Sequence, residues 1–177
     1  MEKLINIISG LNGSGKTTFA ETILVSNNPQ LVYLNPDLIA QGLGADFNIS
    51  SMKAGRILLT SINQKISKGE SFAFESTLSG LTYASIITSA KDLGYKIVIY
   101  YLYVENIETN INRIKTRVSH GGHFIPEETV MRRHQRCLNN FWNIYRPLTD
   151  EWYILNNTYN TPQLLMDSSQ FEDFPVQ

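Results

Sequence analysis

A glycine-rich segment near the N-terminus constrains this chain more than any other feature. Residues 10–17 read Gly-Leu-Asn-Gly-Ser-Gly-Lys-Thr and match the phosphate-binding loop pattern G-x-x-x-x-G-K-S/T in full. An isoleucine-rich run of strand length (3–9) precedes the loop and a helical pattern (16–25) follows it, which is the context that the motif requires. The sequence therefore predicts an α/β protein that binds a nucleoside triphosphate.

Each residue type in the loop has a chemical role in holding phosphates. The glycines let the backbone curl so that N–H groups point at phosphate oxygens, and the positive end of the following helix adds to this field. Lys16 is expected to be exposed in the cleft and to bridge the β- and γ-phosphates of ATP, while the Thr17 hydroxyl would ligate Mg²⁺. The predicted nucleotide-binding residues are Gly10, Asn12, Gly13, Ser14, Gly15, Lys16, Thr17 and Thr18.

Composition narrows the class of protein. A length of 177 residues predicts one domain over residues 1–177, and a net charge of −1 gives no general reason to expect nucleic acid or a membrane surface. The single cysteine, Cys137, excludes a disulfide within the chain and favours a reducing, cytoplasmic location. We find no pattern of a signal peptide and no apolar run of transmembrane length.

Strand and helix patterns alternate along the rest of the chain. Strands are predicted at 31–34, 71–74, 95–104 and 152–155, with 163–166 as a short further candidate. Helices are predicted at 50–68, 81–93, 106–118 and from Pro126 to near Pro147. This alternation predicts a P-loop NTPase fold with a parallel sheet of about five strands flanked by helices. The polar end, residues 167–177, is expected to be loose.

Asp37 lies two residues after the predicted second strand, at the edge of the sheet where ligands bind. A kinase needs a carboxylate there to orient the acceptor hydroxyl and take its proton. The alternative is that Asn35-Pro36-Asp37 begins a helix and that Asp37 caps its free N–H groups. Spacing alone leaves both interpretations open.

Residues 75–80 read Glu-Ser-Thr-Leu-Ser-Gly and follow the predicted third strand. A carboxylate at this position can hold Mg²⁺ or the acceptor, and the hydroxyl-bearing loop after it can line a substrate rich in hydroxyl groups. The alternative is an ordinary turn with a helix cap. The position of Glu75 at a strand end favours the functional interpretation.

Basic residues are concentrated between positions 113 and 136, where a Gly121-Gly122 pair separates two predicted helices. Two basic helices joined by glycines are typical of a small lid that closes over a triphosphate and neutralises the transferring group. The alternative is a solvated basic face, and the three histidines of this region have no neighbouring cysteine or paired carboxylate that would favour a metal site. The basic residues are Arg113, Lys115, Arg117, Arg132, Arg133 and Arg136, against the acidic Glu127 and Glu128.

Several segments together resemble the short, single-domain members of the zeta-toxin group of P-loop kinases. They are 10–17, Asn-Pro-Asp-Leu-Ile-Ala at 35–40, Ala-Gly-Arg at 54–56, 72–80, Gly-Tyr at 94–95, 113–118, 121–127 and 152–158. The resemblance implies an adenylate-kinase-like core that phosphorylates a sugar hydroxyl with ATP, because zeta toxins are kinases of UDP-N-acetylglucosamine. It implies that Lys16 is the phosphate lysine, Asp37 the base, and Glu75 a carboxylate for metal or acceptor. It further implies that Arg117 with Arg132 or Arg133 stabilises the transition state, that Arg56 and Thr77 join the acceptor site, and that an antitoxin protein is a possible partner.

Two features depart from the pattern of that group. Relatives usually carry Asp-Asn-Ser after the fifth strand, where this chain has Asn156-Asn157-Thr158, and the chain is shorter than the larger zeta toxins.

Two other functional classes remain open. A nucleotide hydrolase or switch would use the same loop, although we find no Asn-Lys-x-Asp motif for guanine. A polynucleotide-end kinase would use the lid arginines on nucleic acid, which the lack of basic stripes elsewhere disfavours.

Overall fold

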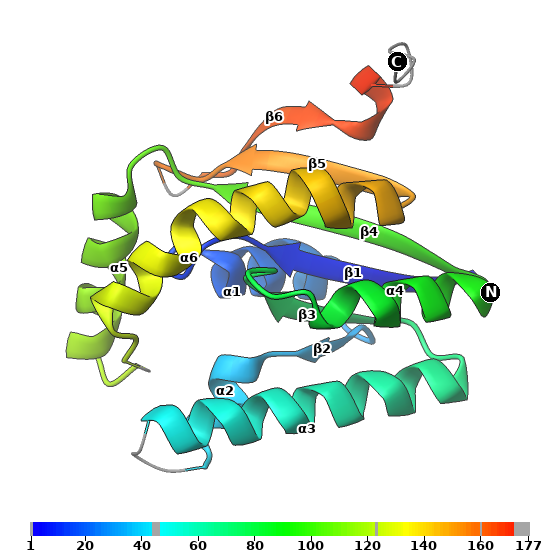
Figure 1. The fold of residues 1–177 in the computed structure, drawn as a ribbon, viewed down its shortest axis with the longest axis horizontal. Coiled ribbons are helices and arrows are strands. Elements are labelled where there is room, and N and C mark those ends of the chain that lie inside the picture. Colours follow the sequence, from blue (N-terminus) through cyan, green and yellow to red (C-terminus); the bar gives the residue numbers. More distant parts are fainter. Residues whose placement is uncertain (1, 44–46, 123, 160, 172–177) are drawn as a thin grey trace.

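The computed structural model describes residues 2–43, 47–122, 124–159 and 161–171. Six strands form one sheet in the order β2-β3-β1-β4-β5-β6 (Figure 1). Strands β1 to β5 pair in parallel, whereas β6 pairs antiparallel to β5. The strands are β1 (Lys3–Ser9), β2 (Val32–Leu34), β3 (Phe72–Ser76), β4 (Tyr95–Tyr103), β5 (Glu151–Asn156) and β6 (Gln163–Asp167).

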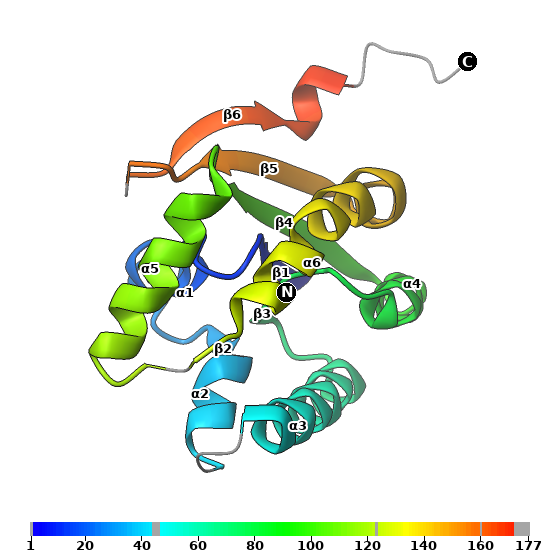
Figure 2. The same ribbon diagram turned by 60° about the vertical axis from the view of Figure 1, so that its left-hand side comes forward.

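Helices connect the parallel strands and pack on both faces of the sheet (Figure 2). α1 (Lys16–Phe19) continues as a π-helical segment, Ala20–Val25, and α6 (Glu127–Asn140) continues through Phe141–Tyr145 and Arg146–Leu148 in π and 3₁₀ geometry. The other helices are α2 (Pro36–Gln41), α3 (Phe47–Lys68), α4 (Thr82–Asp92) and α5 (Ile107–Ser119), with a 3₁₀ turn at Ser168–Phe171. Within the described part of the chain, no helix has both the length and the apolar character needed to cross a membrane.

Alternating side chains on each strand build two separate cores. Ile7 and Phe74 point to the face covered by α3, α4 and the continuation of α6, where they are buried. Ile8 and Ala73, one residue away, point to the opposite face and pack with Phe19 of α1. The period of two along each strand therefore decides which residues face the phosphate loop and α1.

The predicted α/β fold with a mostly parallel sheet flanked by helices is confirmed, with differences in detail. The sheet has six strands because 163–167 adds an antiparallel edge strand. Glu75 lies inside β3 rather than after it, and Pro126 occupies the position before α6. The end predicted to be loose begins with the last residue of β6 and a 3₁₀ turn over 168–171, while 172–177 lie outside the described residues.

Candidate active site

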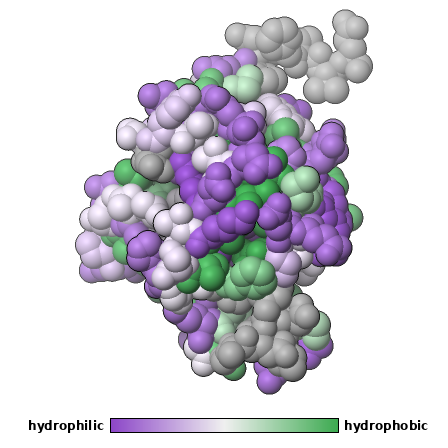
Figure 3. All heavy atoms as spheres, turned by 90° about the vertical axis from the view of Figure 1, so that its left-hand side faces the viewer, coloured by the Kyte–Doolittle hydropathy of each residue, from purple (hydrophilic) through white to green (hydrophobic). Residues whose placement is uncertain are grey.

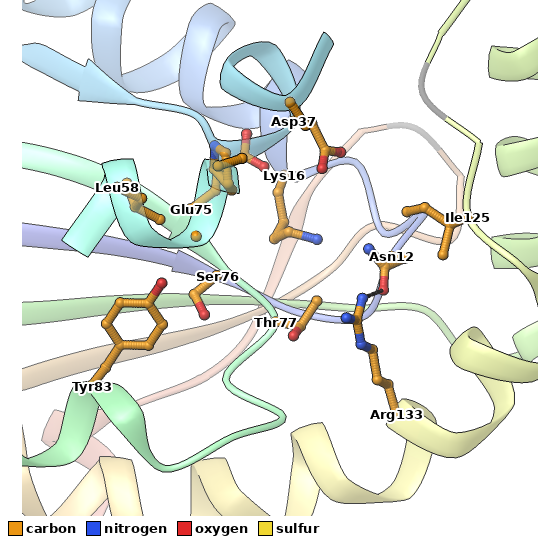
Figure 4. A pocket seen from close by; sticks show the side chains of 14 residues that line it. Asn12, Lys16, Asp37, Leu58, Glu75, Ser76, Thr77, Tyr83, Ile125 and Arg133 are labelled. Carbon is orange, nitrogen blue, oxygen red and sulfur yellow. Dashed lines mark hydrogen bonds between the residues drawn. The ribbon is translucent and has the colours of Figure 1, made fainter. Parts of the chain in front are cut away.

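Two adjoining pockets open at the carboxyl ends of the parallel strands. The larger one, of about 440 Å³, follows the glycine loop, and we call it the phosphate pocket. The smaller one, of about 170 Å³, lies between α2, α3 and the loop after β3, and we call it the side pocket (Figure 4). Four residues line both pockets: Asn12, Lys16, Asp37 and Glu75. Ligands held in the two pockets would therefore meet at these four side chains.

The face of the molecule formed by these strand ends carries mainly hydrophilic residues, with a smaller hydrophobic group among them (Figure 3). The side pocket is lined by both hydrophobic and hydrophilic residues. Leu58, Tyr83 and Ile125 give it apolar walls, while Ser76 and Thr77 add hydroxyl groups. Such a lining, apolar with a few placed polar groups, is typical of a small-molecule site.

The glycine loop has the conformation that its sequence predicts. Gly10, Gly13 and Gly15 have φ values of 134°, 78° and 89°, in the region that favours glycine. A Cβ atom at Gly13 would collide with the backbone of Asn110, and one at Gly15 would collide with the Asn157 side chain. Asn12, Gly13, Gly15, Lys16, Thr17 and Thr18 line the phosphate pocket, whereas Gly10 and Ser14 are buried and do not line it.

Lys16 is buried, with 8% of its surface exposed, so the expectation of an exposed lysine is wrong. Its Nζ donates to the carbonyl oxygens of Gly10 and Leu11, at 3.0 Å each. Burial lowers the pKa of Lys16, while the nearby carboxylates of Glu75 and Asp37 raise it in part. Figure 4 places Lys16 at the centre of the site, with Asp37 and Glu75 on one side and Thr77 and Arg133 on the other.

Glu75 is 2% exposed and lies in a network of hydrogen bonds from β2 and its end. Tyr33 Oη donates to Glu75 Oε1, and Asn35 Nδ2 donates to the same oxygen at 3.3 Å. Burial raises the pKa of Glu75, and the charge of Lys16 and a hydrogen bond with Thr17 oppose this effect. The Thr17 hydroxyl and the Glu75 carboxylate are thus neighbours, and oxygen ligands of this kind fit Mg²⁺.

Asp37 does not cap α2. The cap is Asn35, whose Oδ1 accepts hydrogen bonds from the backbone N–H groups of Asp37 at 2.8 Å and Leu38 at 3.3 Å. The carboxylate of Asp37 instead forms an ion pair with Arg117, with 3.0 Å between Oδ2 and Nη1. Asp37 is therefore available to face a ligand in either pocket.

The structure separates the basic residues of the predicted lid. Arg113 and Arg117 of α5 line the phosphate pocket, and Arg133 of α6 lines the side pocket. Arg133 Nη1 donates to Asn12 Oδ1 at 3.0 Å, as the dashed line in Figure 4 marks. Arg132 is exposed, as are Arg136 and Arg56, and none of these three lines either pocket. The geometry favours Arg133 over Arg132 and places Arg56 outside the site.

The glycine pair after α5 forms a helix cap. Gly121 N–H donates to Val118 O and Gly122 N–H donates to Arg117 O, both at 2.9 Å, which is the Schellman pattern. Gly121 has φ of 82°. His120 and His134 are exposed, and His123 lies outside the described residues. Among described residues, no three His, Cys, Asp or Glu side chains form a group able to hold a metal ion.

Three asparagines of the site were not among the predicted residues. Asn110 Nδ2 donates to Asn12 O at 3.0 Å and Asn157 Nδ2 donates to Ser14 O at 2.8 Å, so both hold the glycine loop from outside it. Asn35 is the third. Asn110 could have been found as a polar residue within the apolar stripe of α5, and Asn35 from its position before Pro36. Asn157 lies in the segment 152–158 that resembles the zeta-toxin group, but its local sequence does not indicate that it contacts the glycine loop.

Comparisons with known proteins agree with this architecture. A model of the zeta toxin family matches residues 47–157, a range that begins after the glycine loop. An uncharacterized protein from Haemophilus influenzae is 31% identical over 131 residues, which cover 71% of this chain and 88% of that protein.

Two solved structures share the fold at low sequence identity. One comes from the PezAT chromosomal toxin-antitoxin system of Streptococcus pneumoniae, with a TM-score of 0.69 and 14% identity over 98% of this chain and 74% of the other. The second is a chain of the AvrRxo1-ORF1:ORF2 complex solved with ATP, with a TM-score of 0.71 and 18% identity over 94% and 58% of the two chains. Because the family match spans more than half of the sequence, this chain belongs to the zeta toxin family.

Proposed function

We propose that this protein is an ATP-dependent phosphotransferase that moves the γ-phosphate to a hydroxyl group of a small acceptor. The observation that carries the proposal is the shared lining of the two pockets by Lys16, Asp37 and Glu75. A hydrolase needs room only for a water molecule beside the nucleotide, whereas a kinase needs a second pocket that meets the first at the transferring group.

The residues of the site divide the work of phosphoryl transfer between them. The glycine loop and Lys16 bind the phosphates, and Lys16 exchanges its carbonyl partners for phosphate oxygens when ATP is bound. Thr17 and Glu75 would hold Mg²⁺, which supplies charge neutralisation between the phosphates. Asp37 orients the acceptor hydroxyl and takes its proton, and Arg117 and Arg133 neutralise charge on the transferring group from α5 and α6.

For the acceptor we propose a nucleotide sugar such as UDP-N-acetylglucosamine, which the resemblance to zeta toxins supports. Thr77 and Ser76 would contact hydroxyl groups of the sugar in the side pocket. The PezAT and AvrRxo1 neighbours come from a toxin-antitoxin system and a two-protein complex. We extend this to a proposal that a protein partner of antitoxin type binds this chain.

A screen with γ-labelled ATP tests the function. The purified protein is incubated with sugar nucleotides, nucleosides and oligonucleotides, and label is followed in each acceptor and in free phosphate. We expect transfer to a sugar nucleotide that requires Mg²⁺ and is lost in Lys16→Ala. Release of phosphate at the same rate with and without acceptors would instead establish a hydrolase. Transfer of label to an oligonucleotide, at a rate that falls steeply as the salt concentration rises, would establish a polynucleotide kinase.

A further inference from the structure

We infer that Asn35 is a positioning residue that holds the proposed base, Asp37, and the carboxylate of Glu75 at a fixed separation beside Lys16. The inference rests on the proposed function, because it assigns those two carboxylates to one reaction. Asn35 itself lines neither pocket. It would act through its neighbours.

Both ends of the Asn35 amide are used, and they are used on different elements. The Oδ1 atom accepts from the backbone N–H groups of Asp37 at 2.8 Å and Leu38 at 3.3 Å, which fixes the first turn of α2. The Nδ2 atom donates to Glu75 Oε1 at 3.3 Å and lies 3.5 Å from Thr17 Oγ1. Asn35 is 4% exposed, so water competes little for these bonds. One rigid, planar group thus connects α2, β3 and the start of α1.

The sheet explains why this position can serve both carboxylates. β2 pairs in parallel with β3, with Leu34 beside Phe74, and the same register carried one residue further brings Asn35 beside Glu75. Pro36 follows at once, and its fixed φ turns the chain into α2. The direction of Asp37 is therefore set within two residues of the contact with Glu75.

The chemistry needs an asparagine in particular. An aspartate keeps the oxygen that caps α2 but places a second negative charge beside Glu75, and a serine keeps a capping oxygen but cannot reach Glu75 at the same time. Tyr33 also donates to Glu75 and Thr17 forms a hydrogen bond with it, so loss of Asn35 leaves this carboxylate with two of its three side-chain partners. We expect the carboxylate to shift relative to Asp37 rather than to leave the site.

The test compares Asn35→Ser and Asn35→Asp with a matched control. Asn106 caps α5 in the same way, with its Oδ1 accepting from Glu108 N–H at 2.9 Å, and it is exposed and lines neither pocket. Asn106→Ser therefore makes the same change of cap without changing the site. We expect Asn35→Ser to lower kcat roughly 10- to 100-fold, the usual cost of a misplacement near 1 Å, with KM values for ATP and acceptor within about threefold. Asn35→Asp should lower kcat at least as much, while Asn106→Ser keeps the parent kcat.

A double-mutant cycle between Asn35→Ser and Glu75→Ala, which removes the acceptor of the hydrogen bond from Asn35, tests the contact without catalysis. The urea midpoint of unfolding and the dissociation constant for ATP with Mg²⁺ are measured for the parent, both single variants and the double variant. Because each single change removes the same interaction, we expect the double variant to show less than the sum of the two single shifts. This readout decides the inference even if no acceptor is phosphorylated, which would overturn only the proposed function. Additive shifts, or a kcat of Asn35→Ser equal to that of the parent, would overturn the inference.

Discussion

Individual polar residues near Lys16 have separate duties that their order in the chain does not reveal. Asn35 caps α2 and donates a hydrogen bond to Glu75, so Asp37, two residues later, is needed neither as the cap nor as a partner of Glu75. Its carboxylate pairs with Arg117 and lies on the boundary of the two pockets. This separation makes the catalytic and structural interpretations of Asp37 distinguishable by mutation.

Asp37→Asn should lower the rate of phosphate transfer by about 100- to 10,000-fold, the usual contribution of a general base. The fold should remain, because the partly exposed pair with Arg117 stabilises the protein by at most about 1 kcal/mol. Asp37→Ala should be equally inactive and nearly as stable. Asn35→Ala is the matched control for a structural role, and its free energy of unfolding should fall by about 1 kcal/mol because the cap of α2 is lost. Transfer rates and melting temperatures of the three variants check this, and an active Asp37→Asn protein would exclude Asp37 as the base.

Arg133 and Arg132 form a natural pair for testing which arginine contacts the transferring group. Arg133→Lys keeps the charge but loses the planar fork that bonds to Asn12, so we expect the rate of transfer to fall more than the affinity for ATP. Arg132→Lys makes the same chemical change at an exposed position and should leave both unchanged. Steady-state kinetics and ATP titration of the two variants provide the comparison. Equal effects of the two substitutions on transfer rate and ATP affinity would indicate that these arginines belong to a solvated basic face.

At the scale of elements, the loop after β3 carries a backbone conformation that its surroundings stabilise. Leu78, in the loop after β3, has φ of 52° although it is a leucine, and it is 1% exposed. Asn140 of α6 donates to its carbonyl oxygen at 2.9 Å, so α6 and the core hold this loop beside the side pocket. The cap after α5 similarly fixes the turn that carries Arg117.

The two glycines of that cap should respond differently to substitution. A Cβ atom at Gly122 would lie 2.6 Å from Arg117 Cγ and 2.8 Å from its carbonyl oxygen, so Gly122→Ala should disturb the end of α5 and displace Arg117. We expect Gly122→Ala to lower the free energy of unfolding by about 1–3 kcal/mol and to slow phosphate transfer. Gly121→Asn should cost less than about 1 kcal/mol, because asparagine tolerates the left-handed conformation and open space surrounds the position. Denaturant unfolding and transfer assays compare the variants, and an unaffected Gly122→Ala protein would contradict the close contact.

At the scale of the whole molecule, Asp150 connects a helix to the far end of the sheet from the site. One carboxylate oxygen accepts from Lys91 Nζ of α4, and the other accepts from the Ile97 N–H of β4, at 2.8 Å each. Partial burial raises the pKa of Asp150, but the bonds from Lys91 and Ile97 outweigh this effect and lower it below its usual value. Its carboxylate therefore stabilises the fold in the charged form.

The direction of this pKa shift gives the pH dependence. The stability due to ionised Asp150 is complete above the pKa of an unfolded aspartate, near 3.8, and is lost as pH falls through the lower pKa of the folded state. Asp150→Asn should be less stable than the parent at pH 7, and the difference should shrink below about pH 4. The control, Asp92→Asn, removes an acid from the exposed end of α4, the helix that carries Lys91, and should not destabilise the protein. Urea unfolding at pH 7 and at pH 3 measures this, and a difference that grows in acid would contradict it.

The sequence by itself determined the glycine loop, the alternation of strands and helices and the order of the candidate residues, because these depend on neighbours along the chain. The glycines at 10, 13 and 15 allow the positive φ values of the loop, and the period of two in β1 and β3 selects the buried faces. Only the tertiary structure decided that Lys16 is buried, that Arg133 rather than Arg132 faces the site, and that Asn35, Asn110 and Asn157 hold it together. Those facts depend on contacts between residues as far apart as Ser14 and Asn157. Such contacts arise only when the sheet order brings β2, β3, β1, β4 and β5 side by side, so a local pattern can mark Asn35 or Asn110 as unusual but cannot identify the residue that each contacts.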